Sequence, residues 1–391
     1  MPFGRSMLSH WLLDPEQTYL NHGTVGVTPR RVLEKQQALR DEIERQPSRF
    51  LLRELAGEMP APWREKSRLR EAMDRVAPFL GSRPEDMVFV PNVTVGVNAV
   101  LGSIPLAPGD EVLITDLAYG AVRTTARVVC ERSGATLKTV AIDYPVRDSG
   151  DVVESVVNAI TPATKLAIVD HVTAQTALVL PVASIARECH ARGVAVLVDG
   201  AHAPGSRHVD IGALGVDWYS ANLHKWMLTP RGCGILWAAP ERQSILHSPI
   251  VSWGRDRGFL HEFEHTPTFD PTSFLAAPEA IALLQEWGFD ACVAYMHGLA
   301  WDAGLALTER WQTTLDTPRE MTGAMVTVPL PSGAGATEDD ATRLRLELLV
   351  EDGIEVALHA YGGRLWARVS TQIYNDTADV MWLGEAVARR A

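Results

Sequence analysis

Short apolar runs alternate with helix-like segments through the middle of the chain. Five of these runs are rich in Val, Ile and Leu and end at a polar turn, as buried strands do. They are residues 87–90, 111–115, 135–142, 165–172 and 194–198. Helical segments are expected between them, near 93, near 120, over 151–160 and over 182–192. This alternation predicts an α/β fold with a mostly parallel sheet that is covered on both faces.

The first 80 residues lack this alternation. Residues 14–28 contain two glycines and few charges, which predicts a loop: either one whose backbone approaches another group closely, or a tight entry loop. A helix is expected to begin at Thr28-Pro29, since proline is favoured in the first turn. The helices expected in this part of the chain are residues 30–46, 46–54 and 63–80, the last ending before Gly81.

The last 150 residues change pattern again. Residues 240–275 are rich in Pro, Gly, His and Arg and are expected to be irregular, whereas 278–312 have a helical pattern. From residue 324 onward the pattern predicts a smaller α+β unit. Its expected strands are 325–328, 354–356 and 366–370, and its expected helices are 337–351 and 376–390.

Composition narrows the classes of function. The 391 residues carry a formal net charge of −12, which argues against non-specific nucleic-acid binding and against binding to an anionic membrane. The four cysteines form no C-x-x-C pair, as expected in a reduced cytoplasm. No apolar run approaches the length of a membrane span, and the first residues lack a secretion-signal pattern. A cytoplasmic protein is therefore expected.

The strongest chemical signal joins Asp199 and Lys225. Asp199 ends an apolar run, where a buried carboxylate is costly unless a cation meets it. Lys225 lies in the segment Asn-Leu-His-Lys-Trp that precedes a glycine-containing turn. A sheltered, partly neutral lysine can form a Schiff base with a cofactor aldehyde, and a protonated pyridine nitrogen is a suitable cation for Asp199. Pyridoxal 5'-phosphate (PLP) needs this pair, although a lysine alone is usually a surface cation.

Other polar residues lie where such a cofactor would need them. Thr94 is at a strand-to-helix turn, which suits a phosphate, and its alternative role is that of a helix N-cap. Tyr119 follows a strand end and is placed to stack on a flat ring, the alternative being core packing. His202 is placed to touch a phenolic oxygen, and Asn222 and His224 are placed to donate to a phosphate.

Two further features bear on the function. Arg368 lies in an apolar strand, where its charge needs either a substrate carboxylate or an internal ion pair. His261–His265 match the H-E-x-x-H zinc pattern, which requires a helix. Because Gly258 and Pro267 flank the motif closely, no sustained helix and no metal site are expected there. The chain contains no Walker lysine loop and no G-x-G-x-x-G motif, which weakens nucleotide binding as an interpretation.

Taken together, these residues resemble the class V aminotransferase-like enzymes of PLP fold type I, and within them the isopenicillin-N epimerase-like group. The resemblance covers nearly the whole chain. The segments that carry it include LLDPEQTYLNHGTVGVTPR, FVPNVTVGVN, DLAYGA, DHVTAQTALVLPV, VDGAHAPG, NLHKW, FDPTSFLAAPEAI and ARVSTQIY.

The resemblance implies roles for individual residues. Lys225 would bind the cofactor aldehyde, Asp199 would pair with the pyridine nitrogen and Tyr119 would stack on the ring. The residues implied at the phosphate are Val93, Thr94, Asn222 and His224. Those implied near the phenolic oxygen are His202 and Thr173, and those implied at the substrate carboxylate are Asn21 and Arg368.

The resemblance also implies a homodimer in which Thr268 reaches the phosphate of the partner subunit. Three parts of the chain are expected: an N-terminal segment, 1–28, that contributes to the active site; a large PLP-binding domain, 29–275; and a linker helix with a small domain, 276–391. Two positions depart from the family pattern. Pro267 stands where the family usually has glycine, and proline removes an N–H, which puts the cross-subunit contact in doubt. Ala174-Gln175-Thr176 stands where the family commonly has Ser-Pro-Thr.

The sequence leaves several reactions open at the Cα of an amino-acid substrate, where Lys225 is placed to act as the base. Cleavage of the C–S bond of a cysteine S-conjugate by β-elimination ranks first, because it needs only the lysine and a good leaving group. Epimerisation ranks second, since it needs another acid facing Lys225 and none is evident. Transamination, decarboxylation-coupled oxidative deamination of a cysteine conjugate, a PLP-fold binding protein without turnover and a zinc hydrolase are the remaining alternatives.

Overall fold

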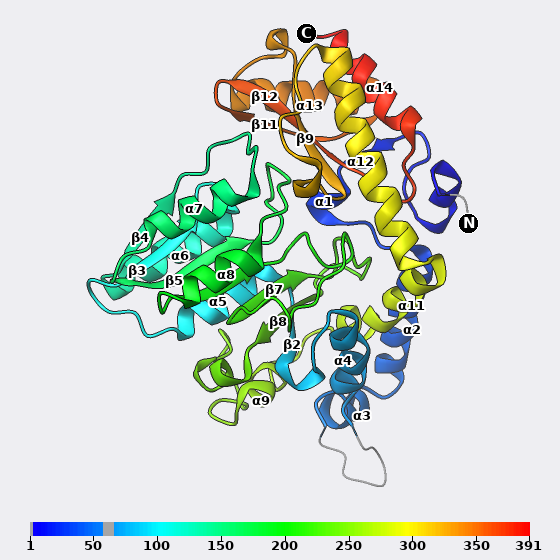
Figure 1. Ribbon diagram of the computed structural model, residues 1–391. Helices are drawn as coiled ribbons and strands as arrows, with labels where there is room; N and C mark the ends of the chain where they lie inside the picture. Colours follow the sequence, from blue (N-terminus) through cyan, green and yellow to red (C-terminus); the bar gives the residue numbers. More distant parts are fainter. Residues whose placement is uncertain (1–2, 58–65) are drawn as a thin grey trace.

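A seven-stranded sheet forms the centre of the computed structural model, which describes residues 3–57 and 66–391 (Figure 1). The strand order is β2-β8-β7-β6-β5-β3-β4. The strands are β2 (Met87–Val90), β3 (Glu111–Thr115), β4 (Thr136–Val140), β5 (Thr164–Asp170), β6 (Ala195–Asp199), β7 (Trp218–Asn222) and β8 (Gly234–Ala238). Strands β7 to β4 run parallel, whereas β8 is antiparallel to both of its neighbours. The predicted mostly parallel α/β sheet is confirmed.

Helices cover both faces of this sheet. Helices α5 (Val93–Ser103) and α6 (Gly120–Ser133) contribute to one apolar core, and α7 (Ser149–Ala159) and α8 (Val182–His190) contribute to the other. Successive side chains of β3 alternate between them: Val112 and Ile114 enter the first core, and Leu113 enters the second. Because apolar side chains cover both faces of the sheet, these strands appear in the sequence as unbroken apolar runs.

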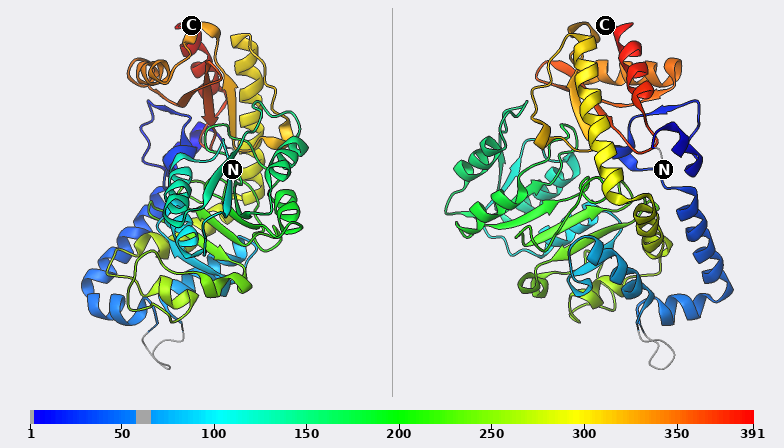
Figure 2. Two further views of the ribbon diagram at one scale, coloured as in Figure 1. Left: turned by 90° about the vertical axis from the view of Figure 1, so that its left-hand side faces the viewer. Right: turned by 45° about the vertical axis from the view of Figure 1, so that its right-hand side comes forward.

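The N-terminal helices lie beside this sheet and close to α11 (Ala277–Trp287) (Figure 2). They are α2 (Arg30–Arg45), α3 (Pro47–Arg49) with a π-helical turn at Phe50–Glu54, and α4 (Arg68–Phe79). The expected helix over 63–80 starts outside the described residues, and its described part ends before Gly81, which has a positive φ of 65°. Among the residues that the structure describes, no helix is long and apolar enough to cross a membrane.

A smaller antiparallel sheet, of order β11-β12-β9, lies in the C-terminal part. Its strands are β9 (Met325–Pro329), β11 (Ala357–Tyr361) and β12 (Arg364–Ser370), and its helices are α12 (Phe289–Trp311), α13 (Glu338–Asp352) and α14 (Thr377–Ala388). One face, which includes Val328 and Ala367, packs against these helices. The N-terminus is tied to this unit because β1 (Thr18–Tyr19) pairs with β10 (Ile354–Glu355). The division at residues 28 and 275 stays a prediction.

Several expected elements differ from the structure. The loop over 14–28 contains β1 and a short helix, α1 (His22–Val25). The stretch 240–275 is not uniformly irregular, since it contains a 3-10 turn at Pro240–Ile245 and the short helices α9 (Phe259–Glu264) and α10 (Thr272–Leu275). The helical pattern over 278–312 forms two helices, because Gly288 takes a left-handed conformation between them. Strand β11 was missed, since its short sequence carries a weak apolar pattern.

Candidate active site

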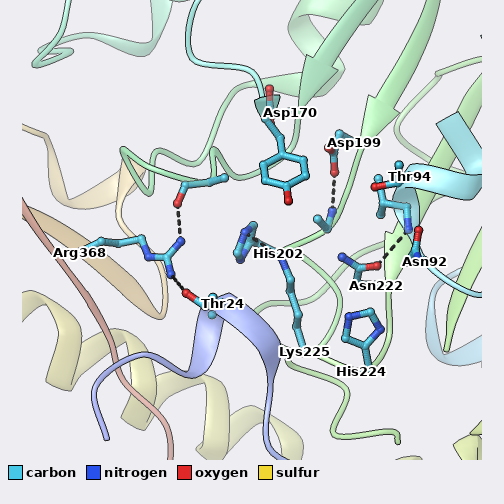
Figure 3. A pocket seen from close by; sticks show the side chains of 15 residues that line it. Thr24, Asn92, Thr94, Asp170, Asp199, His202, Asn222, His224, Lys225 and Arg368 are labelled. Atoms are coloured by element: carbon cyan, nitrogen blue, oxygen red, sulfur yellow. Dashed lines mark hydrogen bonds between the residues drawn. The ribbon is translucent and has the colours of Figure 1, made fainter. Parts of the chain in front are cut away.

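A cavity of about 320 Å³ opens at the carboxyl ends of β5 and β6, beside the N-terminus of α5, and Arg368 reaches it from the small sheet (Figure 3). All predicted site residues except Asn21, Thr173 and Thr268 line it. Its full lining is Gly23, Thr24, Asn92, Val93, Thr94, Tyr119, Asp170, Ala174, Asp199, Ala201, His202, Asn222, His224, Lys225 and Arg368. The cavity therefore lies where ligands bind in open α/β sheets.

Lys225 lies in the loop after β7, and its side chain reaches into the cavity (Figure 3). Burial, together with the positive charge of Arg368, lowers the pKa of Lys225 to about 8. Its Nζ atom lies 3.2 Å from Nε2 of His202, and burial lowers the pKa of that imidazole well below its usual value. A neutral imidazole beside the amine does not repel it. Lys225 is thus available in its nucleophilic, neutral form near pH 8.

Asp199 ends β6 and presents one unsatisfied oxygen. Its Oδ1 atom accepts a hydrogen bond from the backbone of Ala201 at 2.9 Å, whereas the buried Oδ2 atom has no partner among the described residues. Asp170 is its register neighbour on β5. Burial and the charge of Asp199 raise the pKa of Asp170 well above its usual value, which favours the protonated form of this carboxyl. Burial also raises the pKa of Asp199, whose Oδ2 atom has no hydrogen-bond partner among the described residues, and a protonated pyridine nitrogen would supply the missing cation.

The N-terminus of α5 forms the opposite end of the cavity. The side chain of Asn92 caps the helix, because its Oδ1 atom accepts from the backbone of Val95 at 3.1 Å. The alternative role considered for Thr94, that of the N-cap, is therefore wrong; Thr94 is inside the first turn. Asn222 accepts from the backbone of Val93 at 3.0 Å, which holds the end of β7 against this turn. A helix N-terminus attracts an anion such as a phosphate.

Arg368, on β12, reaches the cavity from the small sheet. Its guanidinium donates to the carbonyl of Ala174 at 2.5 Å, to Oδ1 of Asn21 at 3.0 Å and to the hydroxyl of Thr24 at 2.6 Å. No carboxylate among the described residues pairs with it, so the alternative of an internal ion pair is wrong. Burial lowers the pKa of Arg368 to about 10. A buried cation held only by neutral oxygens can bind an incoming carboxylate.

The remaining predicted residues occupy varied places. Tyr119 is half exposed at the cavity rim, so it is not core packing. Asn21 lies behind Arg368, where its Nδ2 atom donates to Glu355 at 2.8 Å. Thr173 is fully buried and accepts from the backbone of Leu178 at 2.8 Å, which closes a turn. Thr268 lines a separate cavity of about 290 Å³. The roles assigned to these residues stay predictions.

The zinc-like motif serves a local purpose. The residues from Phe259 to Glu264 form a helix of six residues that ends before His265, so a short helix is present where only a sustained helix was expected to be absent. His261 and His265 stack on each other with ring centroids 3.5 Å apart. Glu262 accepts from Nδ1 of His247 at 3.0 Å and from the backbone of Asp256 at 3.0 Å. The carboxylate of Glu262 is thus already used to hold the preceding loop, and the absence of a metal site stays a prediction.

These groups fit PLP. The cavity offers a partnerless carboxylate oxygen on Asp199 for the ring nitrogen, a helix N-terminus for the phosphate and a partly neutral amine on Lys225 for the aldehyde. A model of the aminotransferase class-V family matches residues 27–383. The chain belongs to this family. Its cofactor is accordingly PLP, and the protein is a PLP-dependent class V enzyme.

Relatives within the family carry different names. The chain is 33% identical to an isopenicillin N epimerase from Streptomyces clavuligerus, over 96% of this chain and 95% of that protein. It is 29% identical to a putative L-cysteine desulfhydrase from Oryza sativa subsp. japonica, over 94% of this chain and 82% of that protein. The fold matches that of the cystine C-S lyase C-DES with a TM-score of 0.79, at 22% identity over 96% of this chain and 98% of that one.

Other residues near this class V site were missed from the sequence. Asp170, Asn92 and Thr24 line the cavity, and the N-terminal segment packs directly against the lysine loop. A Cβ atom at Gly26, whose φ is 66°, would overlap the carbonyl oxygen of His224. Asp170 carries a readable signal, because it ends an apolar run just as Asp199 does. Thr24 carries none, since its position depends on how the first 28 residues fold across the site.

Proposed function

We propose that this enzyme cleaves the C–S bond of a cysteine S-conjugate by β-elimination. The overall change converts the conjugate and one water into a thiol, pyruvate and ammonia. PLP, when bound, withdraws electrons from the substrate Cα. The roles that follow are those of the protein's own residues.

In this proposal Arg368 binds the substrate carboxylate and so fixes which bond at Cα faces Lys225. The Lys225 amine takes the Cα proton, and the electron pair left at Cα expels the sulfur from Cβ as a thiolate. The charge of Asp199 keeps a proton on the ring nitrogen, which favours loss of that Cα proton. The N-terminal turn of α5, with Asn222 and His224, holds the phosphate so that the reacting atoms keep their positions.

One observation favours elimination over the alternatives. Thr24 and Ala174 of the cavity lining accept hydrogen bonds from Arg368, and among the described lining residues Lys225 and His202 are the titratable groups whose pKa is lowered by its charge. Both carboxyls of the lining, Asp170 and Asp199, lie at the strand ends, on neighbouring strands. Elimination needs one base, and Lys225 is that base. The names of the desulfhydrase and C-S lyase relatives also support the proposal.

Epimerisation of an amino acid is the second candidate, favoured by the 33% identity to the isopenicillin N epimerase. It requires a second proton donor on the face of Cα opposite Lys225. Tyr119, half exposed at the rim, is the side chain of the lining that could be tested for this role.

Product analysis separates the candidates. The PLP-loaded enzyme is incubated with a panel of S-substituted cysteines, and free thiol, pyruvate, carbon dioxide and the enantiomer ratio of the remaining amino acid are measured. We expect thiol and pyruvate in equal amounts. Inversion without thiol release would establish epimerisation instead. A keto acid that retains its sulfur would indicate transamination, and carbon dioxide would indicate decarboxylation; either would overturn the elimination.

We further propose that the enzyme is a cytoplasmic homodimer with Thr268 near the partner's active site. The cavity around Thr268 is bordered by Leu52 and Trp253, which are exposed, Trp253 by 91% of its surface. Apolar side chains so placed usually mark an interface. The four cysteines are unpaired and buried, which supports a reducing compartment. Light scattering would give the oligomeric state, and a monomer at working concentrations would contradict the dimer.

A further inference from the structure

The small sheet turns a polar and aromatic face toward the large sheet. Side chains alternate along its strands, so Leu365, Ala367 and Val369 enter the core of the C-terminal unit. Trp366 and Arg368 therefore point the other way. The paired residues on the neighbouring strands share this second face, and they include Thr327, Pro329, His359 and Tyr361. Only Arg368 has a place in the reaction proposed above.

An aromatic cavity of about 230 Å³ lies against this face. We define it by Tyr144, from the segment between β4 and α7, and by Tyr361, Arg364 and Trp366 of the small sheet. The ring of Tyr144 lies 5.5 Å from that of Tyr361, edge to face, and 5.0 Å from that of Trp366. The guanidinium of Arg364 lies over Trp366 at 5.4 Å from the ring centroid. Four flat groups from both parts of the chain thus surround one space.

This aromatic cavity is next to the carboxylate site. Thr327 lines it and is the register partner of Arg368. The hydroxyl of Thr327 donates to the carbonyl of Gln175 at 3.1 Å, and the carbonyl of the preceding residue, Ala174, accepts from Arg368. Trp366 and Arg368 are two residues apart on one strand, which places them about 7 Å from each other along it. The carboxylate site and the aromatic cavity are therefore neighbours along β12, with separate linings among the described residues.

We propose that the aromatic cavity binds a planar group, such as an aromatic ring, at the far end of the substrate, so that the preferred substrate is an aryl-bearing S-conjugate of cysteine rather than free cysteine. This inference names the substrate class of the site and rests on the proposed function only for the reaction that follows binding. It assigns the specificity of the enzyme to Tyr144, Tyr361 and Trp366.

The composition of the cavity favours a flat neutral group over a cation. The guanidinium of Arg364 already occupies the face of Trp366, so a second cation there would be repelled. The carboxylate of Asp316, at the rim, accepts from Thr314 at 3.4 Å and lies 3.9 Å from Arg147. Aromatic rings gain free energy from offset or edge-to-face contact beyond that from burial, and a saturated ring of the same size does not.

Binding of unreactive analogues tests this inference without turnover. The analogues are 3-(benzylthio)propanoate, 3-(cyclohexylmethylthio)propanoate and 3-(methylthio)propanoate, which keep the carboxylate and the sulfur but lack the amine. Their dissociation constants for the PLP-loaded enzyme are measured by calorimetry. We expect the benzyl compound to bind about five times more tightly than the cyclohexylmethyl compound, the factor that an aromatic contact supplies.

Variants locate the effect. Tyr361 is partly exposed, so Tyr361→Leu is expected to fold and to bring the benzyl-to-cyclohexylmethyl ratio close to one, whereas Tyr361→Phe keeps it. Trp382→Leu, on α14 and away from the aromatic cavity, is the control and leaves the ratio unchanged. Arg368→Lys weakens all three analogues in parallel. Equal binding of the two ring compounds to the wild type, or a preference that persists in Tyr361→Leu, would overturn the inference.

The outcomes separate this inference from the proposed function. If the enzyme prefers the benzyl analogue but releases no thiol from S-benzylcysteine, the aromatic binding site is supported and the proposed elimination is refuted. If the S-benzyl and S-cyclohexylmethyl conjugates release thiol with equal kcat/KM and the analogues bind equally, the elimination is supported and the aromatic site is refuted.

Discussion

Replacing Arg368 by lysine tests the carboxylate site most directly. The guanidinium donates through Nη1 to Ala174 and through Nη2 to Asn21 and Thr24, and no carboxylate of the described chain neutralises it. A lysine keeps the charge but presents a single ammonium, which cannot hold these neighbours and a two-oxygen carboxylate at once. The variant therefore removes the two-point hydrogen-bonding geometry of the guanidinium and keeps its positive charge.

The size of the effect follows from the bonds lost. Charge-assisted hydrogen bonds contribute about 1.5–3 kcal/mol each, so losing one bond to the substrate carboxylate lowers kcat/KM about 10- to 150-fold. Because the carboxylate is bound in the ground state as well as during reaction, most of this loss is expected in KM. Thermal unfolding of the same variant measures the loss of stability that follows from weaker hydrogen bonds to Thr24 and Ala174, and this loss is expected to be smaller.

The assay compares a substrate with its carboxamide. Wild-type enzyme should prefer the carboxylate substrate strongly, and Arg368→Lys should lose the share of that preference that comes from the second hydrogen bond, about 10- to 150-fold. Arg343→Lys, on the exposed surface of α13, is the matched control and should behave as the wild type. If Arg368→Lys keeps the wild-type KM, or loses activity equally on the acid and the amide, then Arg368 does not bind the carboxylate.

Three further predictions concern the cofactor end. Lys225→Ala should abolish turnover and the covalent PLP label that borohydride fixes at residue 225. The control, Lys165→Ala, removes a surface lysine and should keep both. Normal turnover by Lys225→Ala would refute the role of Lys225 as the cofactor lysine. Because burial lowers the pKa of Lys225 to about 8, and only the neutral amine attacks, the rate of PLP incorporation into the apoenzyme should rise about tenfold per pH unit below that value and then level off. The rate is measured by absorbance, and a rise that continues to pH 10 would indicate an ordinary lysine. Asp199→Asn should weaken PLP binding about 100-fold or more, since it removes the charge that meets the ring nitrogen. The control, Asp151→Asn at an exposed position of α7, should leave PLP binding unchanged, and unchanged affinity in Asp199→Asn would argue against the contact.

The sequence predicted the parts of the site that follow directly from strand ends. Asp199 and Lys225 could be recognised because an apolar strand ends in an acid and because the lysine loop follows the next strand. Asp170 ends a strand in the same way, but its importance depends on being the register neighbour of Asp199. The order of strands in a sheet cannot be predicted from the local pattern of apolar residues. The seven-stranded order, with β8 antiparallel between β2 and β7, is likewise a result of long-range pairing.

The least predictable parts were those whose structure depends on distant contacts. Residues 14–28 have no strong periodicity, and their short strand and helix form because β10 and β12 supply partners more than 300 residues away. The aromatic cavity was invisible for the same reason, since Tyr144 and Trp366 meet only after the two sheets are placed. Helix α9 was missed because six residues between a glycine and a proline-containing turn carry too short a pattern.

The N-terminal segment links the two sheets mechanically. It is hydrogen-bonded to the small sheet through Asn21 and Ser370, and five residues later Gly26 rests on the carbonyl of His224, beside the reactive lysine. The position of the loop that carries Lys225 is therefore coupled, through this segment, to the position of the small sheet. A Cβ atom at position 26 would overlap the carbonyl of His224, so any side chain there would displace the loop that presents the amine.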